Sequence, residues 1–542
     1  MEEEAQLEVA TAGTPAAPKG IFAGGEGKDF KVLAAGTAQN IAGLAVFVIG
    51  TFGANILISR AFGGGSLGAI SLGIVTIGTQ FAFIAAAGTR FGMDMAAVRY
   101  VAIEDGAGHR GRIRAVVARS ALLAAALSIV AGALTYLLAG PIGRKLSEPA
   151  TLSQTVGAVR AAGVAIPFVA LTFVWLAAGR GLKIMRHTLY VQWVAQPILW
   201  IVLMLAFWQV SKTEAAAVWA YAASWVVSAV AARFFWLSIS KGSAEPLEQD
   251  VTRALVRYGA PRALAALLSQ GLFWIDYFVA ATFITVGGVV TSDDLGVYAS
   301  AVRVALAMVL FLTAVAYVFS PFVADLHARG ERERLDKLFK AITRWTVAGT
   351  IPILLLMLIV PDAILQVFGG KTFMSGTAAL RILVIGQAIN VSVGAAGFVL
   401  IMAGRTGWDL VVYAVSASID LTLAYILVPK FGIEGAAAAQ AITIALSNWL
   451  RLYLVRRFVG IFPWDRRYAR LAIPAAACAA GMLAVHAVTG GSTWYVDLSG
   501  VAVAGAIVYV PVLLAFGTTP EEKVALRNGL AKLRAGRGAT RA

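Results

Sequence analysis

Long apolar runs follow one another from residue 32 to residue 516, separated by short polar segments. A bilayer core about 30 Å thick is crossed by about 20 apolar helical residues, because no water is present there to satisfy bare backbone groups. The pattern therefore predicts an all-α integral membrane protein with about 14 transmembrane helices. The expected spans are 32–58, 67–89, 115–140, 158–179, 188–209, 215–238, 263–286, 296–322, 345–368, 380–403, 408–428, 434–455, 471–489 and 498–516.

The composition agrees with a membrane protein. The 542 residues are 59% hydrophobic and only 14% charged, with a mean hydropathy of +0.79. The acidic stretch before the first run is too polar for a secretory signal peptide, so residues 1–31 are expected to form a disordered cytoplasmic tail. Residues 517–542 are expected to form a basic cytoplasmic tail.

The chain has a net charge of +16, and most of its Lys and Arg residues lie in the connecting segments. If the N-terminus is inside, the cytoplasmic segments and their flanks hold 36 Lys and Arg, and the opposite side holds seven. This asymmetry is the positive-inside bias. It predicts a multi-pass protein of the cytoplasmic membrane with both termini cytoplasmic. Because membrane topology explains the positive charge, we expect no nucleic-acid partner.

The loops argue against an enzyme. The connections on the predicted outer side are short, and the longer loops 90–114, 239–262 and 323–344 carry no glycine-rich phosphate loop and no Cys/His metal cluster. None of the four histidines has a second ligand at i+4, so no metal site is expected. We expect no catalytic residues and no cofactor.

A loose repeat divides the chain. The segment that starts at Arg60 and the basic loop after it are matched by the segment that starts at Thr291 and its own basic loop. This predicts an N-lobe of helices 1–6 (residues 32–240) and a C-lobe of helices 7–12 (residues 241–457). An even number of helices per unit gives both lobes the same orientation. Helices 13 and 14 (residues 458–516) are expected at the periphery.

Four short segments carry a likeness to a known family. They are Phe91-Gly-Met-Asp-Met-Ala-Ala-Val-Arg-Tyr-Val-Ala, Phe273-Trp-Ile-Asp-Tyr-Phe-Val, Leu295-Gly-Val-Tyr-Ala-Ser-Ala-Val-Arg and Val428-Pro-Lys-Phe-Gly-Ile-Glu-Gly-Ala-Ala-Ala-Ala. With the helix count, they resemble the polysaccharide (O-antigen type) flippases of the multidrug, oligosaccharidyl-lipid and polysaccharide exporter superfamily.

The resemblance implies a transporter for polysaccharide biosynthesis. Such a carrier flips a polyprenyl-pyrophosphate-linked oligosaccharide across the cytoplasmic membrane by alternating access, and it works beside other polysaccharide assembly proteins. A pyrophosphate and sugars cannot cross hydrocarbon, so the carrier needs a hydrated cationic cavity.

Charged residues deep in the predicted spans are the first candidates for that cavity. Arg303 and Asp276 lie at similar predicted depths, and we expect them either to form a buried ion pair or to serve in substrate binding or gating. Asp420 is a further deep acid, although the family more often has an uncharged polar residue there.

Uncharged amides supply further candidates. Those chosen for the site are Gln39, Asn40, Gln196, Gln270 and Asn390. Others with the same chemistry are Gln80, Gln192, Gln387, Gln440 and Asn448. Amides in membrane helices often serve only to join helices, so fewer than half are expected to line a cavity.

Two transporters of the same superfamily remain as alternatives. A multidrug cation antiporter has an acid in its first helix, and residues 32–58 contain none. A lipid II flippase has several arginines and an acid in the first-lobe cavity, and the first helix here offers Gln39 and Asn40. A non-transport role in polysaccharide assembly is disfavoured by the short loops.

Overall fold

The computed structural model describes residues 28–240 and 249–518, and all regular structure in these ranges is helical. The side chains of some residues in these ranges, near the start of α2 and in the middle of α13, lie outside the description. Ten helices are long and apolar enough to span a bilayer, and a bent pair brings the number to eleven. The predicted all-α, multi-pass membrane fold is confirmed. The count of fourteen spans stays a prediction.

The helices depart from the predicted spans at several places. Spans 408–428 and 434–455 form one long element, α18 (Thr406–Phe458), which bends at Gly432 with φ 57° and ψ −133°. Span 188–209 consists of α8 (Arg186–Thr188), the π-helical turn η1 (Leu189–Ala195) and α9 (Gln196–Val210). Pro197 lacks a backbone donor, so the regular hydrogen-bond pattern is lost before it.

Another interruption divides span 263–286. Its residues lie in two helices, α11 (Gln249–Gly271) and α12 (Ile275–Thr282), and the chain bends by 62° between them. The break follows Gly271 and gives the two halves different neighbours. α11 packs against α3 and α4 of the N-lobe and also against α18, whereas α12 packs mainly against α18.

The helices of the predicted N-lobe pack around α7 (Leu152–Gly181). This helix packs against α3 (Gly65–Thr89), α4 (Met93–Gly106), α5 (Arg110–Leu137) and α10 (Glu214–Ile239). Its buried face carries small residues, among them Ala158, Ala161, Ala162 and Ala165. Small side chains let helices approach closely, which is how helices pack where lipid removes most of the hydrophobic driving force. α2 (Lys28–Ala61) and α6 (Ala139–Leu146) complete this part.

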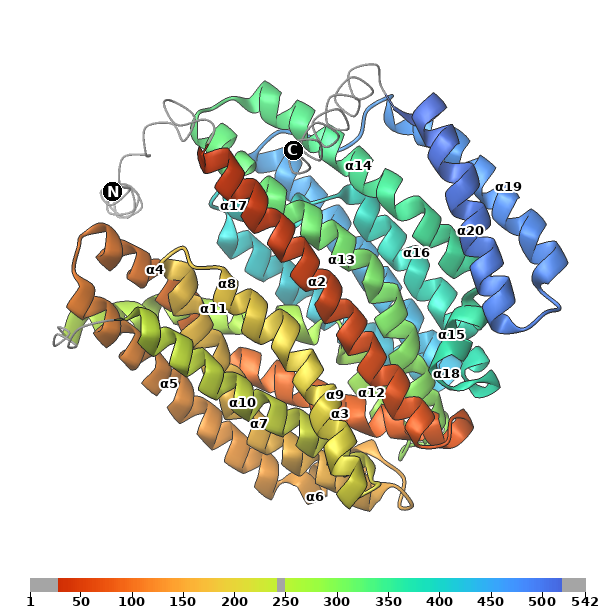
Figure 1. Cartoon of the computed structure of the whole chain (residues 1–542), viewed down its shortest axis with the longest axis horizontal. Coiled ribbons are helices and arrows are strands. Elements are labelled where there is room, and N and C mark those ends of the chain that lie inside the picture. Colours follow the sequence, from red (N-terminus) through yellow and green to blue (C-terminus); the bar gives the residue numbers. More distant parts are fainter. Residues whose placement is uncertain (1–27, 241–248, 519–542) are drawn as a thin grey trace, which may run out of the picture.

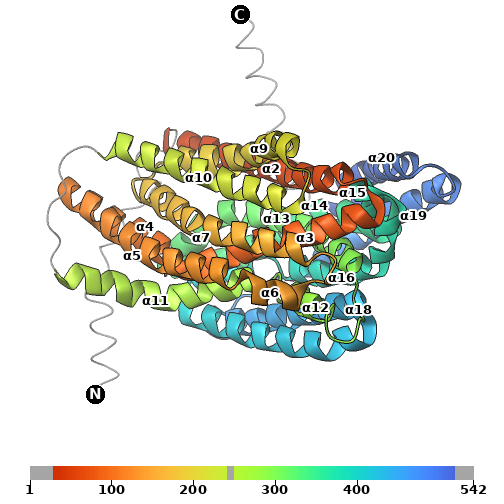
Figure 2. The same cartoon turned by 90° about the horizontal axis from the view of Figure 1, so that it is seen from below.

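The predicted C-lobe contains, after α11 and α12, the elements α13 (Ser292–Ala328), α14 (Arg332–Ile359), α15 (Pro361–Gly369), η2 (Lys371–Gly376), α16 (Thr377–Val393), α17 (Ala396–Met402) and α18. Beyond it come η3 (Tyr468–Leu471), α19 (Ala472–Thr489), α20 (Trp494–Val512) and η4 (Leu513–Gly517). Figure 2 shows α19 and α20 at one end of the molecule, and they pack on each other, on α14 and on α15.

The lobes meet along α3 and α13. In Figure 1 the two groups of helices diverge toward the ends of α4 and α17 and converge near α12 and α15. At the converging end a methyl group on Gly296 of α13 would overlap the Ala69 carbonyl oxygen of α3, so only glycine allows this approach. This closed seam positions the candidate site.

Candidate functional site

A cavity of about 140 Å³ lies where α2, α3, η1, α9 and α10 face α13. Its walls combine amide, hydroxyl and aromatic side chains with a single charged group. The twelve lining residues are Phe47, Thr51, Asn55, Thr79, Gln80, Phe83, Gln192, Gln196, Trp200, Tyr221, Trp225 and Arg303. Eleven come from the N-lobe, and Arg303 alone comes from the C-lobe. These twelve include no carboxylate, so the cavity is electropositive.

Arg303 is held at this position from both lobes. It is 7% exposed, and its Nη1 donates to the Ala299 carbonyl oxygen at 3.0 Å within α13. Its Nη2 donates to Thr76 Oγ1 of α3 at 2.8 Å. The guanidinium also lies 5.3 Å from the centroid of the Trp274 ring. A guanidinium carries five N–H donors, so these two bonds leave donors for an anionic ligand.

Amide side chains form part of the cavity wall, and one of them, Gln196, directly precedes Pro197 at the start of α9. Gln196 is 4% exposed and its Nε2 donates to Ser224 Oγ at 3.3 Å, which joins α9 to α10. On the facing helix, Asn55 Nδ2 donates to the Thr51 carbonyl oxygen at 2.6 Å. Asn55 Oδ1 is buried and has no protein partner. An unpartnered buried acceptor is costly, and a ligand hydroxyl would satisfy it.

Asp276 and Arg303 do not form the ion pair considered from the sequence. Asp276, at the start of α12, accepts hydrogen bonds from the Tyr298 hydroxyl and from Gln440 Nε2. No ion pair within 4.0 Å joins it to Arg303 in the described part of the chain. The break between α11 and α12 explains the difference, because it places α12 against α18 while Arg303 reaches α3.

The two deep acids form a cluster of their own. Asp276 and Asp420 are fully buried, and neither belongs to the cavity lining. Both side-chain oxygens of Asp420 lack a hydrogen-bond partner. Two buried carboxyl groups in one cluster need a neutralising proton or cation.

The remaining predicted site residues are scattered. Gln270 is half-buried near the end of α11, and Asn390 Nδ2 donates to Gln387 Oε1 at 3.0 Å within α16. Neither lines the cavity. The side chains of Gln39 and Asn40 lie outside the described residues. Among the sequence candidates whose side chains the structure describes, Arg303 and Gln196 are the two that come together at the cavity.

Several site residues were missed from the sequence. Thr76, which binds Arg303, stands in an apolar span and has no distinguishing local pattern. Tyr221 and Trp225 stand four residues apart on α10 and therefore share one helix face, a spacing that would have pointed to them. Trp200 packs edge-on against Tyr221 with ring centroids 5.2 Å apart. Together these rings form an aromatic wall.

Residues 57–205 match the family model described as MatE. The fold of the chain is shared with solved structures described as transporters of the MOP superfamily.

Two solved structures illustrate the shared fold. One is the lipid II flippase MurJ in an inward closed conformation, with a TM-score of 0.70, 14% identity, and coverage of 90% of this chain and 98% of the other. The second is an inward-facing multidrug resistance MATE family transporter, with a TM-score of 0.58, 17% identity, and coverage of 78% and 94%.

Two curated proteins are similar to this chain in sequence. The probable low-salt glycan biosynthesis flippase Agl15 of Haloferax volcanii is 26% identical over 212 residues, which is 39% of this chain and 43% of that protein. The uncharacterized membrane protein MJ1068 of Methanocaldococcus jannaschii is 27% identical over 128 residues, 23% of this chain and 25% of that protein. The matches thus span less than half the length of these two relatives.

Proposed function

We propose that this protein is a transporter that flips a polyprenyl-pyrophosphate-linked oligosaccharide across the cytoplasmic membrane by alternating access. The observation that carries the proposal is Arg303, the one charged residue among the twelve that line the cavity. A guanidinium suits the oxygens of a diphosphate. The amides and aromatic rings beside it suit the hydroxyls and faces of sugars, and the Haloferax volcanii relative is named as a probable glycan biosynthesis flippase.

The cavity must enlarge before it binds such a substrate. Its volume of about 140 Å³ is well below the roughly 300 Å³ at which ordinary ligand pockets begin. The lobes are joined at depth by the bond from Arg303 to Thr76 and by a 2.8 Å bond from the Tyr277 hydroxyl to the Gly73 carbonyl oxygen. Substrate entry therefore comes from the diverging end of the lobes, which the charge distribution predicts to be cytoplasmic.

A diphosphate at Arg303 would compete with Thr76 for the same guanidinium. Exchange of the Thr76 hydroxyl for a charged ligand weakens one of the contacts that hold α3 to α13. Substrate binding would thereby favour separation of the lobes on the converging side, which is the step that releases cargo to the outer leaflet.

The acid cluster supplies a place for energy coupling. Asp276 and Asp420 lie in the C-lobe apart from the cavity, and their buried carboxyl groups need a neutralising charge. We assign uptake and release of a proton or small cation to this pair, and substrate binding to Arg303.

The two alternatives predict different cavities or cargo. A cation antiporter needs an acid in its binding cavity, and the twelve lining residues include none. A lipid II flippase would use the same diphosphate chemistry, so cargo analysis must distinguish it.

The test replaces Arg303 and a matched arginine in cells that lack the chromosomal gene. Arg160 of α7 is exposed and stacks on Tyr136, 5.6 Å from the ring centroid, so Arg160→Gln removes a membrane arginine outside the cavity. The two variants are compared at equal amounts of protein in the membrane. Arg303→Gln should leave lipid-linked oligosaccharide in the inner leaflet, whereas Arg160→Gln should restore surface glycan.

Three outcomes contradict the proposal. Full surface glycan with Arg303→Gln would remove its role in binding. Accumulation of peptidoglycan precursors in the deletion strain would assign the cargo to lipid II. Unchanged glycan together with hypersensitivity to cationic dyes would favour a drug antiporter.

A further inference from the structure

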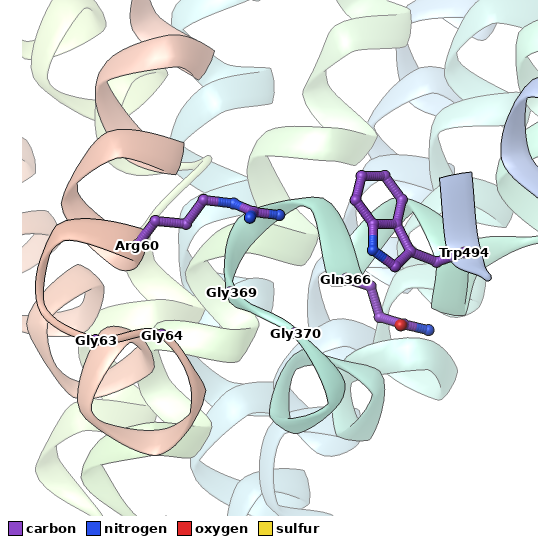
Figure 3. Close-up of a pocket in the computed structure, with 7 residues that line it drawn as sticks. All are labelled: Arg60, Gly63, Gly64, Gln366, Gly369, Gly370 and Trp494. Carbon is purple, nitrogen blue, oxygen red and sulfur yellow. The ribbon is translucent and has the colours of Figure 1, made fainter. Parts of the chain in front are cut away.

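A second pocket, of about 330 Å³, lies at the converging end of the lobes. It is lined by Arg60, Gly63, Gly64, Gln366, Gly369, Gly370 and Trp494. These residues come from the last turn of α2 and the turn that follows it, from α15 and the glycine after it, and from the start of α20. Figure 3 shows Arg60 and Trp494 reaching from opposite sides above the Gly369–Gly370 turn, with the Gln366 side chain below Trp494.

The chemistry of this pocket favours an anion. Its seven lining residues include one cation and no carboxylate. Arg60 is exposed and uses Nε to donate to the Val367 carbonyl oxygen at 2.9 Å, which leaves its terminal N–H groups. In the described part of the chain, no protein hydrogen bond uses the side-chain amide of Gln366 or the indole N–H of Trp494. Three side chains therefore offer donors around one space.

The position of the pocket indicates the source of that anion. It lies at the ends of apolar membrane helices, where α2 stops and α20 begins, and the neighbouring Tyr495 is 56% exposed. Trp and Tyr gather at the level of lipid headgroups because one part of each ring system is apolar and the other polar. Lipid headgroups are a source of phosphate at this level.

The pocket also straddles the two lobes. The bond from Arg60 to Val367 joins α2 to α15. A methyl group on Gly64 would lie 3.1 Å from the Gly369 carbonyl oxygen, so the two glycine turns are in close contact. Separation of the lobes at this end would pull Arg60 away from Gln366 and divide the pocket. A ligand that fills it is therefore bound only while this end is closed.

We propose that this pocket binds the phosphate of an anionic lipid headgroup and thereby holds the two lobes together at the converging end. The site is distinct from the Arg303 cavity and does not depend on which lipid-linked cargo is carried. A zwitterionic headgroup is disfavoured, because the lining residues include no carboxylate for its ammonium group. Lipid composition then sets how often this end opens.

The experiment measures closure with spin labels on the two lobes. Lys212, in the turn before α10, and Ser375, in η2, are both exposed, and each is replaced by Cys in a Cys478→Ala background. Distances are compared in nanodiscs of phosphatidylcholine alone and of phosphatidylcholine with phosphatidylglycerol. Inorganic phosphate is added to the first sample as a separate arm. Phosphatidylglycerol should raise the ratio of closed to open molecules about tenfold, as expected for a charge-assisted bond.

Variants separate the ligand from the direct Arg60 contact. Arg60→Gln should abolish the response to phosphatidylglycerol. Trp494→Phe keeps the Arg60–Val367 bond but loses the indole donor, so it should weaken the response. Arg144→Gln removes an exposed arginine of α6 that does not line the pocket, and it should respond like the wild type.

Each outcome decides one point. An unchanged response in Arg60→Gln, or no response in the wild type, would overturn the proposal. Closure by inorganic phosphate alone would support the anion site and assign its ligand to the aqueous phase. If a variant of this pocket loses the response to lipid but still flips glycan, the result concerns this pocket alone. If Arg303→Gln loses flipping but keeps the response to lipid, the result concerns the proposed function alone.

Discussion

Gly296 is the position where a single methyl group should force the lobes apart. It is buried in α13, and a Cβ atom there would overlap the Ala69 carbonyl oxygen of α3. Restoring an ordinary contact of about 3.5 Å requires α13 to retreat by about 1 to 2 Å. Gly296→Ala should therefore destabilise the closed arrangement of the converging end.

The magnitude follows from the bonds that this movement breaks. The Tyr277–Gly73 and Arg303–Thr76 hydrogen bonds, both 2.8 Å, join the same two regions. A neutral bond contributes about 1 kcal/mol and a bond from a charged donor about 1.5 to 3 kcal/mol. Loss of both removes about 3 kcal/mol, so the ratio of closed to open molecules should fall about 100-fold.

The assay uses the spin labels at Lys212 and Ser375 in a single lipid composition. Gly53→Ala is the matched control, because a Cβ at Gly53 of α2 meets no atom within 4 Å. We expect a longer distance in Gly296→Ala and a wild-type distance in Gly53→Ala. If Gly296→Ala keeps the wild-type distance distribution, the approach of α13 to α3 does not hold the lobes together.

Three further predictions concern orientation, the acid cluster and the peripheral helices. In a cysteine-free background, Ala107→Cys should be protected from an impermeant thiol reagent in intact cells and Lys212→Cys should react; the reverse would invert the topology. Asp420→Asn should leave the melting temperature in detergent unchanged or higher, because both Asp420 oxygens are unpartnered, and a clear decrease would show a bond that stabilises the acid. Tyr509→Phe removes a 2.6 Å bond to the Ala348 carbonyl oxygen and should destabilise the docking of α20 by about 1 kcal/mol, seen as faster hydrogen exchange in α19 and α20 but not in α7.

The membrane class could be predicted from the sequence alone because hydropathy is a local property. Any run of about 20 apolar residues must become a helix in hydrocarbon, whatever its neighbours are. The positions where the helices are interrupted could be predicted less well. Gly432 stands among many glycines, and only packing decides which of them bends a helix.

The candidate site divides in the same way. The sequence alone indicated Arg303 and Gln196, because exposure of an arginine or an amide to the hydrocarbon of the bilayer costs free energy. It did not determine their partners. Helix rotation and the break between α11 and α12 direct Asp276 toward Tyr298 and Gln440, and direct Arg303 to Thr76, which is 227 residues away. Depth in a membrane can be counted along one helix, whereas contact between two helices depends on which faces they present to each other, and only the tertiary structure fixes that.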